Sequence, residues 1–235
     1  MSFLTAGWKK LAMANYAVDP DMLKPFVPYN TELDVWNGTH YASLIGFMFV
    51  DVKVLGIPVP FHVNFEEVNL RFYVRHKDQG VWKRGVVFIH EIVPKPAVTL
   101  LANTLYHEHY ITRRMSHRWE VGEKEQLIRY NWKNKGRANH LEVQASAIAQ
   151  PILPGSEEEF ITEHYWGYTG VNPQKTFEYE VIHPRWEHYP VTSYDIDVDF
   201  KAQYGDAFAA LDQTEPKSVL LAEGSAISIE NKRRL

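Results

Sequence analysis

The chain has 235 residues, of which 45% are hydrophobic and 14% aromatic, and its formal net charge is −4. A chain of this length and composition buries a sizeable core, and we expect a single domain over residues 1–235. The absence of cysteine excludes disulfides, iron–sulfur clusters and cysteine-based zinc sites, and the acidic balance argues against a dedicated nucleic-acid binder.

Strand signals dominate the first part of the chain. A strand is predicted over residues 11–18, followed by a short helix in DPDMLKPFVP, where Asp19 is a capping residue and Pro20 suits the first helical position. Residues 39–55 form a long apolar and aromatic run. Its length predicts a strand that bends across a barrel, with Gly46 as the kink.

The clearest alternation lies in EVNLRFYVR, residues 67–75. Its even-numbered residues are apolar and its odd-numbered residues carry polar groups, which is the two-residue period of a strand. The segment 84–91 is predicted to pair back with it in the antiparallel direction. Residues 95–106 then place apolar side chains at helical spacing, with Pro96 in the first turn.

The second half continues in short strands. Strands are predicted at 138–150, 175–183, 191–200 and 218–229, and Ser156 with Glu159 three residues later predicts a capped helix among them. The tail ENKRRL is expected to lie in solvent. Many short strands with few helices indicate a mainly β protein of the α+β kind, built as an antiparallel β-barrel or curled sheet with a few flanking helices.

The polar face of residues 67–75 is the first candidate site. If the sheet closes into a barrel with this face inside, its side chains form a charged pocket, and we predict that Asn69, Arg71, Tyr73 and Arg75 bind a ligand there. An arginine would hold a carboxylate by two parallel hydrogen bonds. In the other interpretation this face meets water and the even-numbered residues fill the core.

Two further patterns carry candidate chemistry. YHEHY puts His107 and His109 on one face of an extended segment, but no third ligand follows at a defining spacing, so we predict no metal and no cofactor. Lys95 precedes a predicted helix, whose positive N-terminal end disfavours an ammonium group. Lys95 is therefore either a reactive amine with a lowered pKa or a solvated side chain in a corner shaped by Pro94 and Pro96.

Residues 111–140 are locally basic. Eight arginine and lysine residues are interleaved there with Trp119, Tyr130 and Trp132. A basic surface with aromatic rings can stack bases and grip phosphates, which makes this predicted hairpin a candidate nucleic-acid or protein interaction module. Alternatively, these residues are the faces of an ordinary half-exposed β-hairpin.

Several segments resemble the YqjF-like family, a bacterial group of unknown function. They are the run from Thr5 to Phe47, EVNLRFYVR, GVVFIHEIVPKPAVTLLANTLYHEHY, EEEFITEHYWGY and YEVIHPRWEHYP, and they keep their order over nearly the whole chain. The family is similar to the acetoacetate decarboxylases. That resemblance implies a cone-shaped, mostly antiparallel β-barrel with flanking helices and an internal ligand cavity.

The same resemblance implies a role for Lys95. In the decarboxylases a lysine in a Pro-Lys-Lys run forms a Schiff base with a β-keto acid, a second lysine lowers its pKa, and an arginine and a glutamate assist. Pro94 and Lys95 match the start of that run. Pro96 replaces the second lysine, Lys9 stands in place of the arginine, and residues 50–61 contain no glutamate.

The sequence thus predicts a β-barrel that binds a small carboxylate- or carbonyl-bearing organic molecule in its interior. Two alternatives stay open: a Schiff-base lyase or decarboxylase-like enzyme acting on keto acids through Lys95, and the interaction module at 111–140. The N-terminus does not have the pattern of a signal peptide, and no apolar run reaches the ~18 residues of a membrane helix. We therefore expect a cytoplasmic protein without a membrane partner, and the sequence leaves open whether it forms a homo-oligomer.

Overall fold

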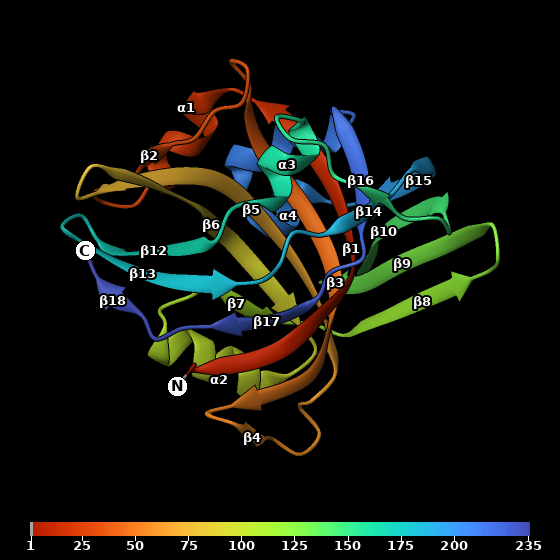
Figure 1. Ribbon diagram of the computed structural model, residues 1–235, viewed down its shortest axis with the longest axis horizontal. Helices are drawn as coiled ribbons and strands as arrows, with labels where there is room; N and C mark the ends of the chain where they lie inside the picture. The colour runs from red at the N-terminus through yellow and green to blue at the C-terminus, as the bar shows by residue number, and fades with distance from the viewer. Residues whose placement is uncertain (1) are drawn as a thin grey trace.

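The computed structural model describes residues 2–235, and its central feature is a closed barrel (Figure 1). Each barrel strand is bonded to the next, and the pairing of β1 with β3 closes the ring. All these pairings are antiparallel except that of β12 with β6. In order around the ring the strands are β1 (Leu4–Val18), β17 (Ala226–Ile229), β13 (Lys175–Ile182), β12 (Trp166–Asn172), β6 (Val81–Val93), β5 (Phe65–Asp78) and β3 (His40–Val54).

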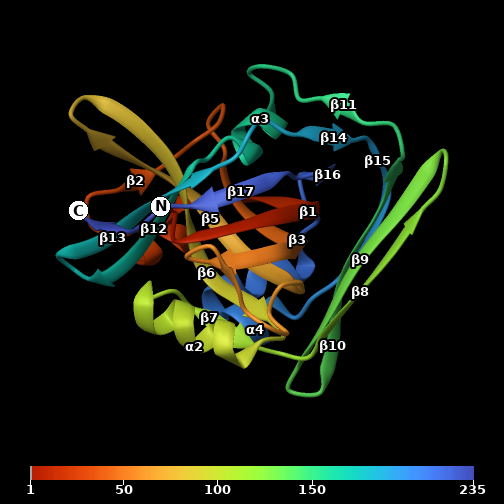
Figure 2. The same ribbon diagram turned by 60° about the horizontal axis from the view of Figure 1, so that its bottom comes forward.

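A second sheet leans against the outside of the barrel (Figure 2). It is antiparallel, in the order β15 (Val191–Asp197), β10 (Arg137–Ser146), β9 (Glu125–Asn134) and β8 (Met115–Val121). Short strands extend the barrel sheet at its rims: β2 (Glu32–Leu33), β4 (Ile57–Pro58), β7 (Tyr110–Thr112), β11 (Gln150–Pro151), β14 (Glu187–Tyr189), β16 (Ser218–Ala222) and β18 (Arg233–Arg234).

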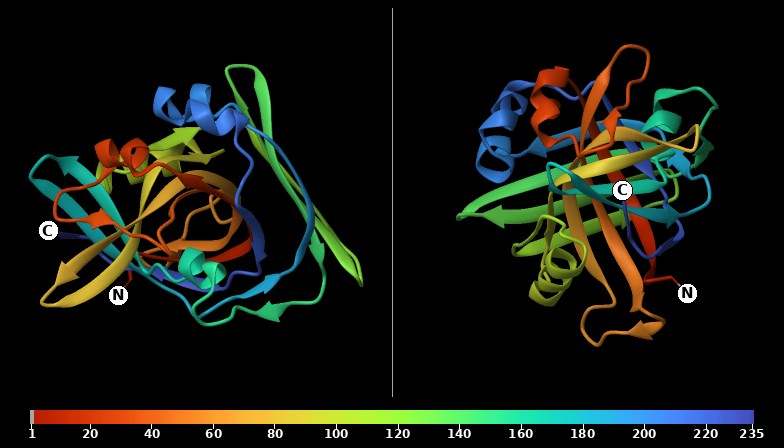
Figure 3. Two further views of the ribbon diagram at one scale, coloured as in Figure 1. Left: turned by 90° about the horizontal axis from the view of Figure 1, so that it is seen from above. Right: turned by 90° about the vertical axis from the view of Figure 1, so that its left-hand side faces the viewer.

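The helices are short and lie around the barrel, as seen from above in Figure 3. Asp19 caps the first by accepting a hydrogen bond from the backbone of Asp21, and Ser156 caps the third by accepting one from Glu159, so both predicted caps are confirmed. The α-helices are α1 (Pro20–Leu23), α2 (Pro96–Leu105), α3 (Glu157–Thr162) and α4 (Phe200–Tyr204), and the 3-10 helices are η1 (Lys24–Phe26) and η2 (Asp206–Gln213). The sequence did not predict α4 and η2.

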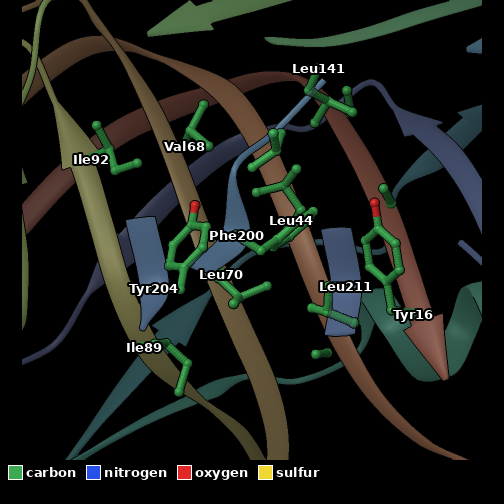
Figure 4. Packing of buried hydrophobic residues seen from close by; sticks show 14 of the residues in the cluster. Tyr16, Leu44, Val68, Leu70, Ile89, Ile92, Leu141, Phe200, Tyr204 and Leu211 are labelled. Atoms are coloured by element: carbon green, nitrogen blue, oxygen red, sulfur yellow. The ribbon is translucent and has the colours of Figure 1, made fainter. Parts of the chain in front are cut away.

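The main core lies between the barrel wall and its outer cover. The even-numbered residues of β5 point outward into this core, where Val68 and Leu70 pack with Leu141 of β10, Phe200 of α4 and Leu211 of η2 (Figure 4). The odd-numbered residues of β5 therefore face the barrel interior. The mainly β fold class is confirmed. The alternation in residues 67–75 separates the side chains that face the barrel interior from those that face the surrounding core.

A β-bulge interrupts the alternation in β6. Leu70 pairs with His90 and Arg71 pairs with Phe88, so Ile89 is an extra residue in the ladder. Because of this extra residue, Glu91 and Phe88 both line the barrel interior although they differ by three positions. With strict alternation along β6, Glu91 and Phe88 would lie on opposite faces of the sheet. The bulge places the Glu91 carboxyl on the inner face together with Phe88.

Two sequence expectations about the C-terminal segment were wrong. The predicted strand 218–229 is two strands, because Gly224 adopts a φ of +79° and an added Cβ would lie 2.2 Å from the carbonyl oxygen of Trp8. The tail does not lie free in solvent, since β18 pairs with β13. Arg233 holds it there by ion pairs of 2.5 Å to Asp78 and 2.6 Å to Glu178.

Candidate ligand-binding site

An internal cavity lies against the inner face of β5, and the centres of water-sized molecules can occupy about 60 Å³ of it. Glu67, Asn69 and Arg71 line it, at successive inward positions of the strand. Trp8 and Trp186 line it as well, and their rings pack edge to face at 6.2 Å. The cavity is therefore a mixed site, with polar groups along β5 and flat apolar walls around them.

Glu67 is buried and bound by two neutral donors. The Asn69 side-chain amide donates to its Oε1 over 2.9 Å, and the Tyr110 hydroxyl donates to its Oε2 over 3.1 Å. Burial raises the pKa of the Glu67 carboxyl from 4.5 to about 7, and these two hydrogen bonds oppose that rise. The Glu67 carboxyl therefore gains or loses its proton near neutral pH, so a charged ligand nearby would change its protonation state.

Two further carboxyl groups lie beside Glu67. Glu91 and Glu108 are almost fully buried, and burial, reinforced for Glu91 by the other two carboxyls, raises the pKa of each above its ordinary value. Glu108 accepts a hydrogen bond of 2.7 Å from Thr169, whereas Oε2 of Glu91 has no hydrogen-bond partner. Neither residue could be singled out from the sequence, because the bulge in β6 changes the orientation of Glu91 and two histidines flank Glu108.

Arg71 is the cation of this cavity. Its Nη2 donates to the carbonyl oxygen of Ile161 over 3.0 Å, and its Nε is buried without a partner. Among residues 2–235 no carboxylate lies within salt-bridge distance of the guanidinium, and Glu67 senses its charge only at longer range. The exposed fraction of Arg71 is 9%. A buried guanidinium without a counter-ion is costly, so the arrangement favours an anionic guest.

The other two residues predicted on this face have different positions. Tyr73 is buried above the cavity, where its hydroxyl and that of Ser43 are hydrogen-bonded at 2.8 Å. Arg75 lies toward the end of β5, paired with Glu32 at 2.6 Å and stacked over the Trp82 ring at 4.3 Å. Neither residue lines the cavity, and Arg75 is already neutralised. The structure thus brings together Asn69 and Arg71 of the predicted set and leaves out Tyr73 and Arg75.

A buried histidine completes the polar lining. His164 Nε2 lies 3.2 Å from Asp34 Oδ2, which also forms a 2.6 Å ion pair with Arg84. Burial lowers the pKa of His164 to about 4, although Asp34 opposes the shift. Burial alone would raise the pKa of Asp34, but hydrogen bonds from His164 and Arg84 outweigh it and lower the value to about 2. His164 is therefore a neutral ring whose Nδ1, with no partner, can accept a hydrogen bond.

Lys95 lies outside the cavity. It is the residue that precedes α2, has extended backbone dihedrals and makes no side-chain cap hydrogen bond. Neither the internal cavity nor the neighbouring cavity beneath α2 has Lys95, or any other lysine of residues 2–235, in its lining. The corner formed by Pro94 and Pro96 thus directs Lys95 to the start of a helix rather than to the barrel interior.

The histidines of YHEHY do not form a metal site with their neighbours. Within residues 2–235 the structure contains no group of three or more histidine and acidic side chains arranged to hold a metal ion. His107 packs against the Phe177 ring, and His109 lies near His90 with ring centroids 6.5 Å apart. The residue of this segment that lines the internal cavity is Tyr110, and Glu108 lines the neighbouring cavity beneath α2.

The basic hairpin differs from a base-stacking surface. Tyr130 and Trp132 are fully buried in the core between the second sheet and the barrel, so neither ring is available to a nucleic acid. Arg129 pairs with Glu142 at 3.0 Å across the same sheet. These two rings occupy the inward positions of the alternating strand β9, as in the alternative of an ordinary half-exposed hairpin. None of the helices within residues 2–235 is long and apolar enough to cross a membrane.

Solved structures of the acetoacetate-decarboxylase-like fold match this mostly β structure. The enduracididine biosynthesis enzyme MppR complexed with pyruvate superposes with a TM-score of 0.69 and 12% identity, covering 100% of this chain and 91% of that chain. Acetoacetate decarboxylase from Legionella pneumophila matches with a TM-score of 0.65 and 12% identity, over 99% and 86% of the chains. At such low identity the likeness shows the fold alone.

The family is shown by sequence. The chain belongs to the DUF2071 family, described as "Uncharacterized conserved protein (COG2071)", whose profile matches residues 5–226. It is 28% identical to the uncharacterized protein YqjF of Bacillus subtilis over 180 residues, which cover 76% of this chain and 72% of YqjF. The resemblance to YqjF-like proteins and to the acetoacetate-decarboxylase fold is therefore confirmed.

Proposed function

We propose that the protein binds a small organic molecule bearing a carboxylate or a carbonyl group in its barrel cavity. One observation carries the proposal: Arg71 is a buried guanidinium that lines the cavity without a carboxylate partner among residues 2–235. A ligand carboxylate would supply the missing charge and would accept hydrogen bonds from the planar fork.

The remaining polar groups suit the same ligand. Asn69 Oδ1 and His164 Nδ1 are buried without partners and can accept hydrogen bonds, while Glu67 and Glu91 donate when they carry their protons. MppR, which has this fold, was solved in complex with pyruvate, and this supports a keto acid as a ligand for this architecture. Protonated glutamates do not repel an anion, so the affinity for a carboxylate should decrease as pH rises and these glutamates ionise.

The alternative of a Schiff-base enzyme acting through Lys95 has less support. An amine that attacks a bound carbonyl carbon must reach it, and Lys95 is absent from the lining of the cavity that holds Arg71. The alternative of a nucleic-acid module at 111–140 loses the stacking rings of Tyr130 and Trp132. Binding of a ligand in the barrel cavity does not require Lys95, Tyr130 or Trp132 to change position.

The experiment is a thermal-shift and calorimetry screen of small carboxylic and keto acids. An acid that binds should raise the melting temperature, and Arg71→Gln should weaken its binding by about 100-fold, since a buried charge-assisted pair is worth roughly 3 kcal/mol. Arg71→Lys keeps the charge without the planar fork and should give an intermediate affinity.

Arg75→Gln is the matched control. It removes an arginine from the same strand outside the cavity, where Glu32 already neutralises it, so ligand affinity should not change. Equal affinities for the unaltered chain and Arg71→Gln, with every variant folded, would reject the proposal.

A further inference from the structure

A second cavity lies beneath helix α2, next to the cavity of Arg71. The centres of water-sized molecules can occupy about 150 Å³ of it, and it is lined mainly by apolar side chains. The barrel strands contribute Val52, Val54 and Phe65, and α2 contributes Val98, Leu101 and Ala102. No residue of α2 is fully buried, so the helix covers this space without filling it.

The two cavities adjoin. Phe49, Glu91, Tyr110, Tyr179 and Ile229 line both of them, so only these side chains separate the polar space from the apolar one. We call the boundary formed by these five side chains the neck. A molecule anchored at Arg71 and longer than the first cavity would have to pass between them to reach the space under α2. The apolar lining there would exclude a second charged group and would favour a hydrocarbon chain.

Glu91 is the carboxyl group of the neck. It pairs with Asn69 across the β5–β6 ladder, and Arg71 lies two positions further along β5, about 7 Å away at the rise of a strand. Its exposed fraction is 2% and its Oε2 has no partner. Burial and the nearby Glu108 and Glu67 raise the pKa of Glu91, so this oxygen is a hydrogen-bond donor when the site is neutral.

We propose that the ligand is an amphiphilic 2-oxo or 2-hydroxy carboxylic acid. Its carboxylate lies on Arg71, its 2-oxygen lies near Glu91 and its apolar chain lies beneath α2. This inference rests on the proposed function for the carboxylate anchor and adds the chemical class of the ligand. The 2-oxygen is inferred from the order of the protein groups between the two cavities. When the ligand carboxylate lies on Arg71, the next ligand carbon lies beside Asn69 and Glu91, and the apolar space begins beyond these two residues.

The test is a chain-length series measured by calorimetry: pyruvate, 2-oxobutyrate, 2-oxohexanoate and 2-oxooctanoate. Affinity should rise by about fourfold for each methylene that enters the apolar cavity. Ala102→Phe, which places a ring in that cavity, should flatten the rise and leave pyruvate binding unchanged. Thr104→Phe is the matched control, because Thr104 is an exposed residue of the same helix outside the lining.

The outcomes separate the two proposals. A flat series on the unaltered chain, with pyruvate binding lost in Arg71→Gln, would overturn the apolar tail and leave the carboxylate site standing. Absence of binding for every acid would overturn the proposed function itself. If the affinity still rises with ligand length in Ala102→Phe, the ligand's hydrocarbon chain does not lie beneath α2. If that variant does not fold, the chain-length series on the unaltered protein still decides whether an apolar tail contributes to binding.

The role of Glu91 has its own comparison. Octanoate, which lacks the 2-oxygen, should bind at least tenfold more weakly than 2-oxooctanoate to the unaltered chain. Glu91→Leu should remove this difference while the chain-length dependence persists. Equal binding of the two acids to the unaltered chain would overturn the assignment of the 2-oxygen to Glu91.

Discussion

Replacing Glu67 by glutamine should change how the stability of the protein depends on pH. Glutamine can accept the hydrogen bond from Asn69 on its oxygen and donate one to the Tyr110 hydroxyl, so the packing is kept and the ionisable group is lost. In the folded state burial raises the pKa of Glu67 from 4.5 to about 7. Between pH 4.5 and pH 7 the folded chain therefore holds a proton that the unfolded chain has released.

The sign and size follow from proton linkage. Stability falls as pH rises wherever the folded state binds more protons, so the contribution of Glu67 is present in full below pH 4.5 and is lost by pH 7. A shift of this size corresponds to about 3 kcal/mol in the free energy of unfolding. The stability of Glu67→Gln relative to the unaltered chain should therefore increase by about 3 kcal/mol between pH 5 and pH 8.

Urea unfolding followed by tryptophan fluorescence at pH 5, 6, 7 and 8 measures this difference. Glu123→Gln, which removes an exposed carboxyl in the turn after β8, is the control and should leave the pH dependence as it is. A constant difference between Glu67→Gln and the unaltered chain across this range would mean that Glu67 is ionised in the folded protein, and would refute the picture of a neutral carboxyl cluster.

Three further predictions concern packing, the buried ion pair and the lysine. Gly46→Ala should lower stability by about 1–3 kcal/mol in urea unfolding, because its Cβ would lie 2.6 Å from the Tyr130 ring, whereas Gly170→Ala meets nothing closer than 3.7 Å and should change little. Asp34→Asn should cost about 2 kcal/mol at pH 7, and the cost should disappear as pH falls from about 4 to 2, since hydrogen bonds from His164 and Arg84 lower the pKa of Asp34 to about 2. Borohydride reduction with pyruvate, read by peptide mapping, should give no adduct on Lys95, and an adduct there would restore the lyase alternative.

Much of the barrel could be predicted from local patterns. The inner and outer faces of β5 follow directly from alternation, because no bulge interrupts that strand and both faces are in contact with other parts of the chain. The caps at Asp19 and Ser156 were also predictable, since a capping side chain and its helix are neighbours in sequence. Asn69 and Arg71 were found in this way.

The remaining site residues depend on contacts that local patterns do not encode. Glu91 reaches the cavity because Ile89 is an extra residue in β6, and a bulge is visible only when the partner strand is known. Alternation predicts which face of the strand a residue lies on, but it does not predict how far the cavity extends along the strand. Arg75 was therefore included in the predicted site although it lies beyond the cavity. The lack of a Cβ at Gly46 makes room for Tyr130 of the second sheet, a contact that the sequence of β3 alone does not reveal.

The ring closure described above also governs the order in which the barrel can assemble. β17 has four residues and joins β1 to β13, with Leu4 pairing with Ile229. During synthesis β1 can pair with β3 early, but its other edge must wait until residues 226–229 have been made. Contacts of such large sequence separation form slowly, and an unpaired edge is prone to join another chain in the meantime. We therefore expect the pairing of this last and shortest strand of the ring to be the step at which folding competes with aggregation.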